Sequence, residues 1–155
     1  VRAIGVSNFT PERLVDLCMN QEVRPTVNQI EIHPFFQQNT ALRVMEDYGV
    51  VPQAWGPFSE AQKDIFNHKT LAKIASRHGK TTAQVILRWH LQRDLPTIPK
   101  TVHQERMTEN LDVFDFELSE KELESIAGMD IGHSEIIDHH CFCTARQLNS
   151  VKIHL

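Results

Sequence analysis

Two cations, Lys100 and Arg106, flank the point where a short apolar run gives way to a helical pattern. Residues 95–99 are predicted to form a strand, and a helix is expected to begin near His103. Free backbone N–H groups and the positive end of the helix dipole favour an anion at such a junction. Lysine supplies a point charge there, and arginine supplies a planar fork suited to phosphate. We interpret the junction as a phosphate-binding site; the alternative is a solvated surface helix with ordinary cations.

This junction ends the last of four units in which a strand is followed by a polar segment and then by helix. The predicted strands span residues 2–6, 26–32, 50–55 and 95–99, and helices are expected to begin near residues 10, 40, 67, 81, 103 and 119. Alternating strands and helices predict an α/β fold with a parallel sheet and right-handed crossovers. Functional side chains are then expected at the carboxyl ends of the strands.

Local signals support these helices. Residues 81–84 and 119–122 match the capping box that starts a helix. In the helix after the junction, Met107, Leu111 and Phe114 recur at intervals of four and three residues, which places them on one helical face.

Composition limits the classes of function. The chain has 155 residues, which fits one domain, and its net charge of −4 with scattered Lys and Arg does not predict a nucleic-acid partner. No apolar run reaches the roughly 20 residues that a membrane span needs, and the start lacks a signal-peptide pattern. Three cysteines do not make a disulfide framework, so a cytoplasmic location is expected. The chain opens without Met inside a strand-like run and is expected to begin in mid-structure.

Several segments, taken in order, resemble one family. They are GVSNF at 5–9, VNQIEIHP at 27–34, AQVILRW at 83–89, IPKT at 98–101, RMTEN at 106–110 and FDF at 114–116. Together they resemble the C-terminal half of an aldo-keto reductase, most like the bacterial 2,5-diketo-gluconate reductase group. The resemblance implies the C-terminal half of a TIM-type (α/β)8 barrel over residues 1–130. It also implies NADPH as cofactor, bound without a Rossmann domain. The apolar periodicity fails from Ile131 onward, so residues 131–155 are expected to form an irregular tail, with a short final helix as an alternative.

The resemblance assigns the nicotinamide end of NADPH to the first three strand ends. Ser7, Asn8 and Gln29 match positions that hold the nicotinamide carboxamide, and side-chain amides complement its donor and acceptor. Trp55 matches the aromatic residue that stacks on the nicotinamide ring. Stacking leaves one ring face open and so determines which hydride moves.

The remaining implied contacts run along the cofactor toward adenine. The pyrophosphate segment comprises Gly56, Pro57, Phe58 and Ser59. The segment for the adenosine 2′-phosphate comprises Lys100, Thr101, Val102, His103 and Arg106. The adenine contacts are Glu109 and Asn110. A lysine and an arginine near a terminal phosphate favour NADPH over NADH.

The motifs that carry the family's catalytic Asp, Tyr, Lys and His do not occur here. Tyr48 is the only tyrosine, and it is predicted to lie on a helix, remote from any strand end. A full barrel needs about 250 residues. We therefore expect half of an NADPH-dependent oxidoreductase that reduces small aldehydes or ketones, without turnover by this chain alone. The alternatives are a non-enzymatic nucleotide-binding or regulatory module and an inert truncated product. A doubly wound sheet is a third possibility, and it is disfavoured because no glycine-rich loop follows any predicted strand.

A half-barrel would leave two strand edges and an apolar interior uncovered. We therefore expect a homo-oligomer, or an N-terminal half of the barrel, to cover them.

Two further interpretations concern histidines and cysteines that have no part in the cofactor assignments. His33, at a strand end before proline, is interpreted as a structural hydrogen-bonding group rather than a proton shuttle. The tail residues His139, His140, Cys141 and Cys143 suit zinc by type, but not by finger spacing, so disorder is favoured over metal binding.

Overall fold

The computed structural model describes residues 1–139 and 141–151. Three strands, β1 (Gly5–Ser7), β2 (Val27–Glu31) and β3 (Val51–Trp55), form a parallel sheet in the order β1-β2-β3. Glu31 lies opposite Trp55 in the β2–β3 register, so these two side chains share the carboxyl edge of the sheet. The predicted parallel α/β fold is confirmed.

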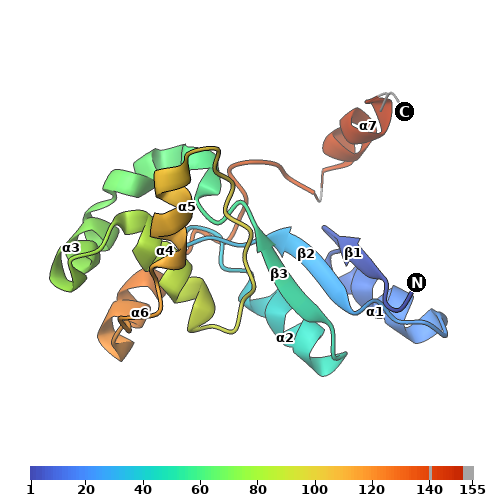
Figure 1. The fold of residues 1–155 in the computed structure, drawn as a ribbon. Helices are drawn as coiled ribbons and strands as arrows, with labels where there is room; N and C mark the ends of the chain where they lie inside the picture. Colours follow the sequence, from blue (N-terminus) through green and yellow to red (C-terminus); the bar gives the residue numbers. More distant parts are fainter. Residues whose placement is uncertain (140, 152–155) are drawn as a thin grey trace.

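Helices follow the strands in the predicted order. The helices are α1 (Pro11–Asn20), α2 (Asn39–Asp47), the short 3-10 segment η1 (Ser59–Asn67), α3 (Lys69–His78), α4 (Thr82–Leu91), α5 (Gln104–Leu111), α6 (Glu120–Ala127) and α7 (Phe142–Ser150). Helices α3 to α6 lie together on the β3 side of the molecule, whereas α1 and α2 lie next to the three strands (Figure 1). Within the described residues, every helix is too short or too polar to cross a membrane.

The predicted fourth strand does not form as a ladder. Thr97 makes one isolated parallel bridge with Ala54, and the Ala54 N–H donates to the Pro96 carbonyl at 2.8 Å. Pro96 and Pro99 have no N–H to donate, so pairing cannot extend in either direction. The segment runs alongside β3 as predicted, but the described sheet has three strands rather than four.

The helix caps are those that the sequence predicts. Thr81 and Gln84 form both hydrogen bonds of a capping box at the start of α4. At α6, the Ser119 N–H donates to the Glu122 carboxylate at 3.0 Å. These caps satisfy N–H groups that a helix start otherwise leaves unpaired, and they orient α4 and α6 against one core.

The apolar face of α5 is largely exposed, although Met107 is about half covered at 47% exposure. No residue of this helix is buried, and Leu111 and the following Phe114 are each 71% exposed. Helical spacing predicts which side chains share a face, but it does not say whether another element packs on that face.

The tail contains a helix. Helix α7 begins after Cys141, and Cys141 is joined to Cys143 by a disulfide. The tail before α7 is irregular, as expected, and α7 is the short final helix that the sequence left open. Both sulfurs are occupied in the disulfide, which removes two donors from the zinc alternative. His140 lies outside the described residues, and within those residues no cluster of three metal-binding side chains occurs.

Candidate functional site

Ser7, Asn8, Gln29 and Trp55 line one depression of about 410 Å³ at the carboxyl edge of the sheet. We call it the Trp55 depression. The Trp55 indole Nε1–H donates to Asn8 Oδ1 at 2.7 Å, and the Ser7 hydroxyl donates to the Gln29 carbonyl at 3.0 Å. Three strand ends thus bring together the residues that the sequence assigned to one end of the cofactor.

Side-chain amides in this depression are already oriented. The Gln29 Nε2–H donates to Gln53 Oε1 at 2.6 Å. The Gln29 side-chain oxygen can therefore accept a hydrogen bond from another donor. Asn8 has φ of 56°, and its backbone N–H donates to the Gln29 carbonyl at 2.9 Å. A left-handed conformation is uncommon for a residue other than glycine and is more readily adopted by asparagine. The turn after β1 therefore holds the Asn8 amide beside the strand ends.

Residues of the tail complete the Trp55 depression, and the sequence did not predict them. Ile137, His139 and Leu148 line it together with the strand-end residues. The His139 ring meets the Trp55 ring edge to face, with centroids 6.2 Å apart. No periodicity in the tail points to these contacts, because they depend on how the tail folds back over the sheet.

The loop after β3 begins beside Trp55 and has an unusual backbone. Gly56 has φ of 58°, and left-handed values recur from Ser59 to Asp64. Ser59 is fully buried, and within the described residues its hydroxyl oxygen has no hydrogen-bond partner. A buried hydroxyl normally has a partner, so the Ser59 hydroxyl could donate to an acceptor that approaches this loop. A phosphate oxygen of a dinucleotide fits that description.

A second depression, of about 440 Å³, contains the predicted anion-binding residues. We call it the cation depression. It is lined by Lys100, Thr101, Arg106, Glu109, Asn110, Phe58, Phe66, Thr81, Thr82 and Ala83. Among the described residues, neither Lys100 nor Arg106 has an ion-pair partner. Phe58 is three residues after Trp55, so the segment between them joins the two depressions.

Hydrogen bonds connect the adenine-side residues to α4. Glu109 accepts from the Thr81 hydroxyl at 2.5 Å, and its carbonyl accepts from the Gln84 side chain at 3.2 Å. The predicted residues Val102 and His103 lie elsewhere. Val102 is 80% exposed, and His103 lines a separate shallow depression on α5. Sequence proximity to Lys100 does not place these two side chains in the cation depression.

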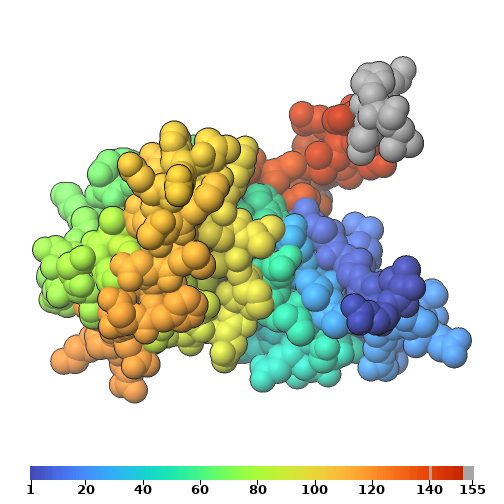
Figure 2. Space-filling model, in the orientation of Figure 1, coloured from blue at the N-terminus to red at the C-terminus, as the bar shows by residue number. Residues whose placement is uncertain are grey.

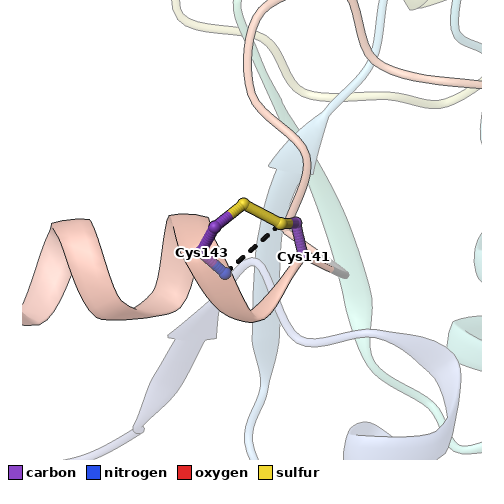
Figure 3. The surroundings of a disulfide bond; sticks show 2 residues. All are labelled: Cys141 and Cys143. Atoms are coloured by element: carbon purple, nitrogen blue, oxygen red, sulfur yellow. Dashed lines mark hydrogen bonds between the residues drawn. A yellow bond between two sulfur atoms is a disulfide. The ribbon is translucent and has the colours of Figure 1, made fainter.

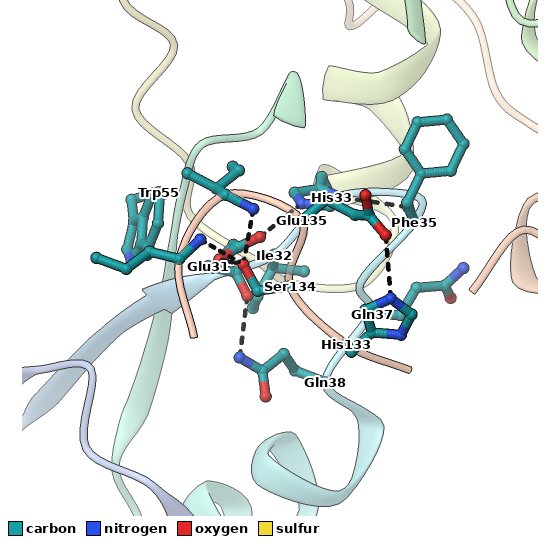
Figure 4. Close-up of polar contacts among 12 residues, drawn as sticks. Glu31, Ile32, His33, Phe35, Gln37, Gln38, Trp55, His133, Ser134 and Glu135 are labelled. Carbon is teal, nitrogen blue, oxygen red and sulfur yellow. Dashed lines mark hydrogen bonds and ion pairs between the residues drawn. The ribbon is translucent and has the colours of Figure 1, made fainter. Parts of the chain in front are cut away.

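A buried polar network lies where β2 ends (Figure 4). His33 Nε2 lies 2.9 Å from Glu31 Oε1, and His33 Nδ1 accepts from the Phe35 N–H at 3.2 Å. Because Nδ1 accepts, Nε2 carries the proton and donates it to Glu31. The other Glu31 oxygen accepts from the Ser134 hydroxyl at 2.6 Å. His33 therefore has a structural hydrogen-bonding role here, as expected, and Ser134 holds the tail to β2.

The tail also contacts the loop after β3. Lys63 Nζ lies 3.3 Å from Glu135 Oε1, and His133 Nε2 lies 3.0 Å from the same oxygen. These partners lower the pKa of Glu135, with Lys63 contributing most. The tail segment is thus attached on one side to the β2 strand end and on the other to the loop that joins the two depressions.

The three-stranded parallel sheet, the helices that follow its strands and the polar residues at its strand ends define an α/β protein with its candidate site at the carboxyl edge of the sheet. The chain belongs to the Aldo/keto reductase family, which matches residues 1–131. The matched residues include the lining of both depressions, except for the tail residues Ile137, His139 and Leu148.

Two relatives illustrate the similarity over most of this chain. It is 44% identical over 132 residues to an aldo-keto reductase of Mycolicibacterium smegmatis, which covers 85% of this chain and 47% of the relative. It is 41% identical over 130 residues to glyoxal reductase of Bacillus subtilis, covering 84% and 46%.

Among solved structures, a mutant of Gox0644 in complex with NADPH aligns with a TM-score of 0.84 at 37% identity, covering 99% of this chain and 53% of that one. The chain therefore spans about half the length of the relatives it matches.

Proposed function

We propose that this chain is the NADPH-binding half of an enzyme that reduces small aldehydes or ketones to alcohols. The observation that carries the proposal is the cation depression, where Lys100, Thr101 and Arg106 lie with Glu109 and Asn110. A terminal phosphate beside an adenine ring has the charge and the hydrogen-bonding groups that this set complements. The complex of the Gox0644 mutant with NADPH and the similarity to glyoxal reductase support the choice of cofactor and substrate class.

The Trp55 depression suits the other end of the cofactor. Asn8 and Gln29 offer amide groups to a carboxamide, and the Trp55 ring offers an aromatic surface for stacking. NADPH supplies a hydride to a carbonyl carbon when it is bound. This chain would orient the nicotinamide and limit its access to water.

The loop after β3 would hold the middle of the cofactor. The proposal assigns the pyrophosphate to residues 56–59, because that segment joins the two depressions and contains the unpartnered Ser59 hydroxyl. Gly56 adopts a left-handed backbone conformation that glycine permits without a steric cost. The fit is therefore supported by a free donor as well as by the two cations.

Among the described residues, no tyrosine lines the Trp55 depression. Tyr48, the only tyrosine, follows α2 and packs against the hydrophobic core. We therefore propose that the chain binds NADPH but does not turn it over alone. The catalytic Asp, Tyr, Lys and His would belong to a part of the parent enzyme outside this sequence.

The test combines a binding and a turnover measurement on the purified chain. NADPH fluorescence is expected to change on titration with the chain, and NADPH absorbance is expected to stay constant after addition of glyoxal. Absence of binding would contradict the proposed function. Consumption of NADPH that depends on the chain would contradict the assignment of catalysis to another part of the enzyme.

The proposal extends to organisation and location. Residues 1–130 would form the cofactor-binding unit and residues 131–155 a tail that covers it. A cytoplasmic location is proposed from the low cysteine content. A second copy of the chain, or the N-terminal half of a barrel, would cover the open sheet edges.

A further inference from the structure

The disulfide between Cys141 and Cys143 is a feature that the proposed function does not use (Figure 3). It closes a loop of only three residues, and cross-linking so short a loop removes little entropy from the unfolded chain. Cys143 is exposed and Cys141 is partly exposed, so a reagent in solution can reach the bond. The position favours chemistry at the sulfurs over a purely stabilising cross-link.

The start of α7 is a suitable environment for a reactive sulfur. Cys141 is the N-cap of this nine-residue helix, and its Sγ accepts from the Cys143 backbone N–H at 3.3 Å. A helix N-terminus stabilises a thiolate through its free N–H groups and its dipole. Thiolate is the form that attacks a disulfide and the better leaving group in exchange.

Helix α7 connects this bond to the Trp55 depression. No residue of α7 is buried, and the helix stands away from the body of the molecule (Figure 2). Its Leu148 nevertheless lines the depression together with Trp55, Asn8 and Gln29. A helix with so little buried surface is held weakly, so the geometry at its first residues strongly affects where Leu148 lies.

We propose that Cys141 and Cys143 form a redox-active dithiol–disulfide pair whose state determines how α7 covers the Trp55 depression. In the disulfide form, the closed ring orients α7 and keeps Leu148 beside Trp55. In the dithiol form, that constraint is absent, and α7 leaves the depression more open. The pair is thus a modification site for thiols and disulfides of low molecular weight.

The exchange balances with a thiol as reductant. A thiolate attacks one sulfur of the pair, which breaks the Cys141–Cys143 bond and forms a mixed disulfide with that sulfur. A second thiolate then attacks the external sulfur and releases the external disulfide. The protein gains two electrons and two protons, and two external thiols lose them. Oxidised glutathione reverses both steps.

Thiol alkylation followed by mass spectrometry tests the redox pair in the full chain. After equilibration with oxidised glutathione, the native chain is expected to take up no alkyl group at Cys141 or Cys143. After treatment with dithiothreitol, both residues are expected to be alkylated, while Cys18 stays protected because it is only 2% exposed. Free thiols at Cys141 and Cys143 after oxidation would overturn the proposal.

Fluorescence quenching by acrylamide tests the link to the depression. The chain has two tryptophans, and Trp89 is 1% exposed, so a change in quenching on reduction reports on Trp55. Reduction is expected to increase quenching in the native chain. The Cys141→Ser/Cys143→Ser double variant is expected to show the higher quenching under both conditions, and Trp55→Phe is expected to abolish the response.

Unchanged quenching in a chain whose alkylation does switch would overturn the coupling to Trp55. Unchanged quenching in the double variant relative to the oxidised native chain would overturn it as well. Neither measurement uses NADPH. Failure of the proposed cofactor binding therefore remains distinguishable from failure of this inference.

Discussion

Lys100 and Arg106 come from different secondary-structure contexts but line the same depression. Lys100 follows the segment that bridges β3, and Arg106 lies in the first turn of α5. Their residue types and spacing led to the prediction that they lie together, and the structure places both in one depression. That this depression binds an anion stays a prediction. The unpartnered Ser59 hydroxyl and the lining residue Leu148 could not be predicted, because both depend on long-range packing rather than on local pattern.

Charge removal in the cation depression has a specific expected result. Arg106→Ala and Lys100→Ala are each expected to weaken NADPH binding at least about tenfold, since a charge-assisted hydrogen bond contributes roughly 1.5–3 kcal/mol. NADH binding is expected to change little, because NADH lacks the 2′-phosphate. Fluorescence titration with both nucleotides measures the two effects.

Lys121→Ala is a matched control, because Lys121 is an exposed lysine on α6 and does not line the cation depression. This variant is expected to bind both nucleotides as the native chain does. An equal loss of NADPH and NADH affinity in the Arg106 variant would contradict a 2′-phosphate contact.

At the scale of elements, local signals predicted helices better than they predicted contacts. The capping boxes of α4 and α6 depend on nearby residues only, and both are present. The fourth strand needed N–H donors that Pro96 and Pro99 lack. The exposed face of α5 and the position of α7 depend on which elements lie opposite, and one sequence does not encode that in a readable pattern.

Helix α4 contains a buried histidine that makes stability depend on pH. His90 lies between the carbonyl oxygens of Ile86, at 2.8 Å, and Ile32, at 3.0 Å. Burial lowers the pKa of His90 to about 4, and it outweighs the two carbonyls, which favour the protonated ring. Nearby Arg93 and His33 lower it further. The unfolded chain therefore binds this proton at higher pH than the folded chain does.

Acidification from about pH 6.5 to pH 4 is expected to reduce the free energy of unfolding by roughly 3 kcal/mol through His90. Urea denaturation across this range measures the effect. His90→Gln is expected to flatten the dependence on pH, because glutamine does not titrate. An unchanged slope in a folded His90→Gln chain would contradict a neutral buried His90.

Glu122 affects a lower range of pH and can be separated from His90. Partial burial raises the pKa of Glu122, but hydrogen bonds from Ser119 and His78 outweigh it and lower the pKa to about 2. Its stabilising effect is therefore complete above about pH 4.5 and is lost as the pH falls toward 2.

At the scale of the whole molecule, the described sheet is open. Strand β1 pairs only with β2 on one side, and the segment around Thr97 ends the sheet on the other. Ile4, Val51 and Ile98 are each between 44% and 51% exposed near these strands. Unpaired strand edges and exposed apolar side chains favour association with another chain.

The isolated chain is therefore expected to form dimers or larger assemblies at micromolar concentration. Sedimentation velocity over a range of concentrations measures the association. The assemblies are expected to dissociate on dilution without loss of helix content, if the edges associate after folding. A monomer throughout the range would contradict the view that these edges need a cover.

The most direct measurement of the central claim is the dissociation constant of the chain for NADPH compared with that for NADH, determined at one ionic strength. The two nucleotides differ by the 2′-phosphate that Lys100, Thr101 and Arg106 are proposed to bind. We predict that NADPH binds at least about tenfold more tightly, which corresponds to one charge-assisted hydrogen bond or more. Equal affinities, or no binding of either nucleotide, would contradict the claim that this half-barrel holds NADPH through its cation depression.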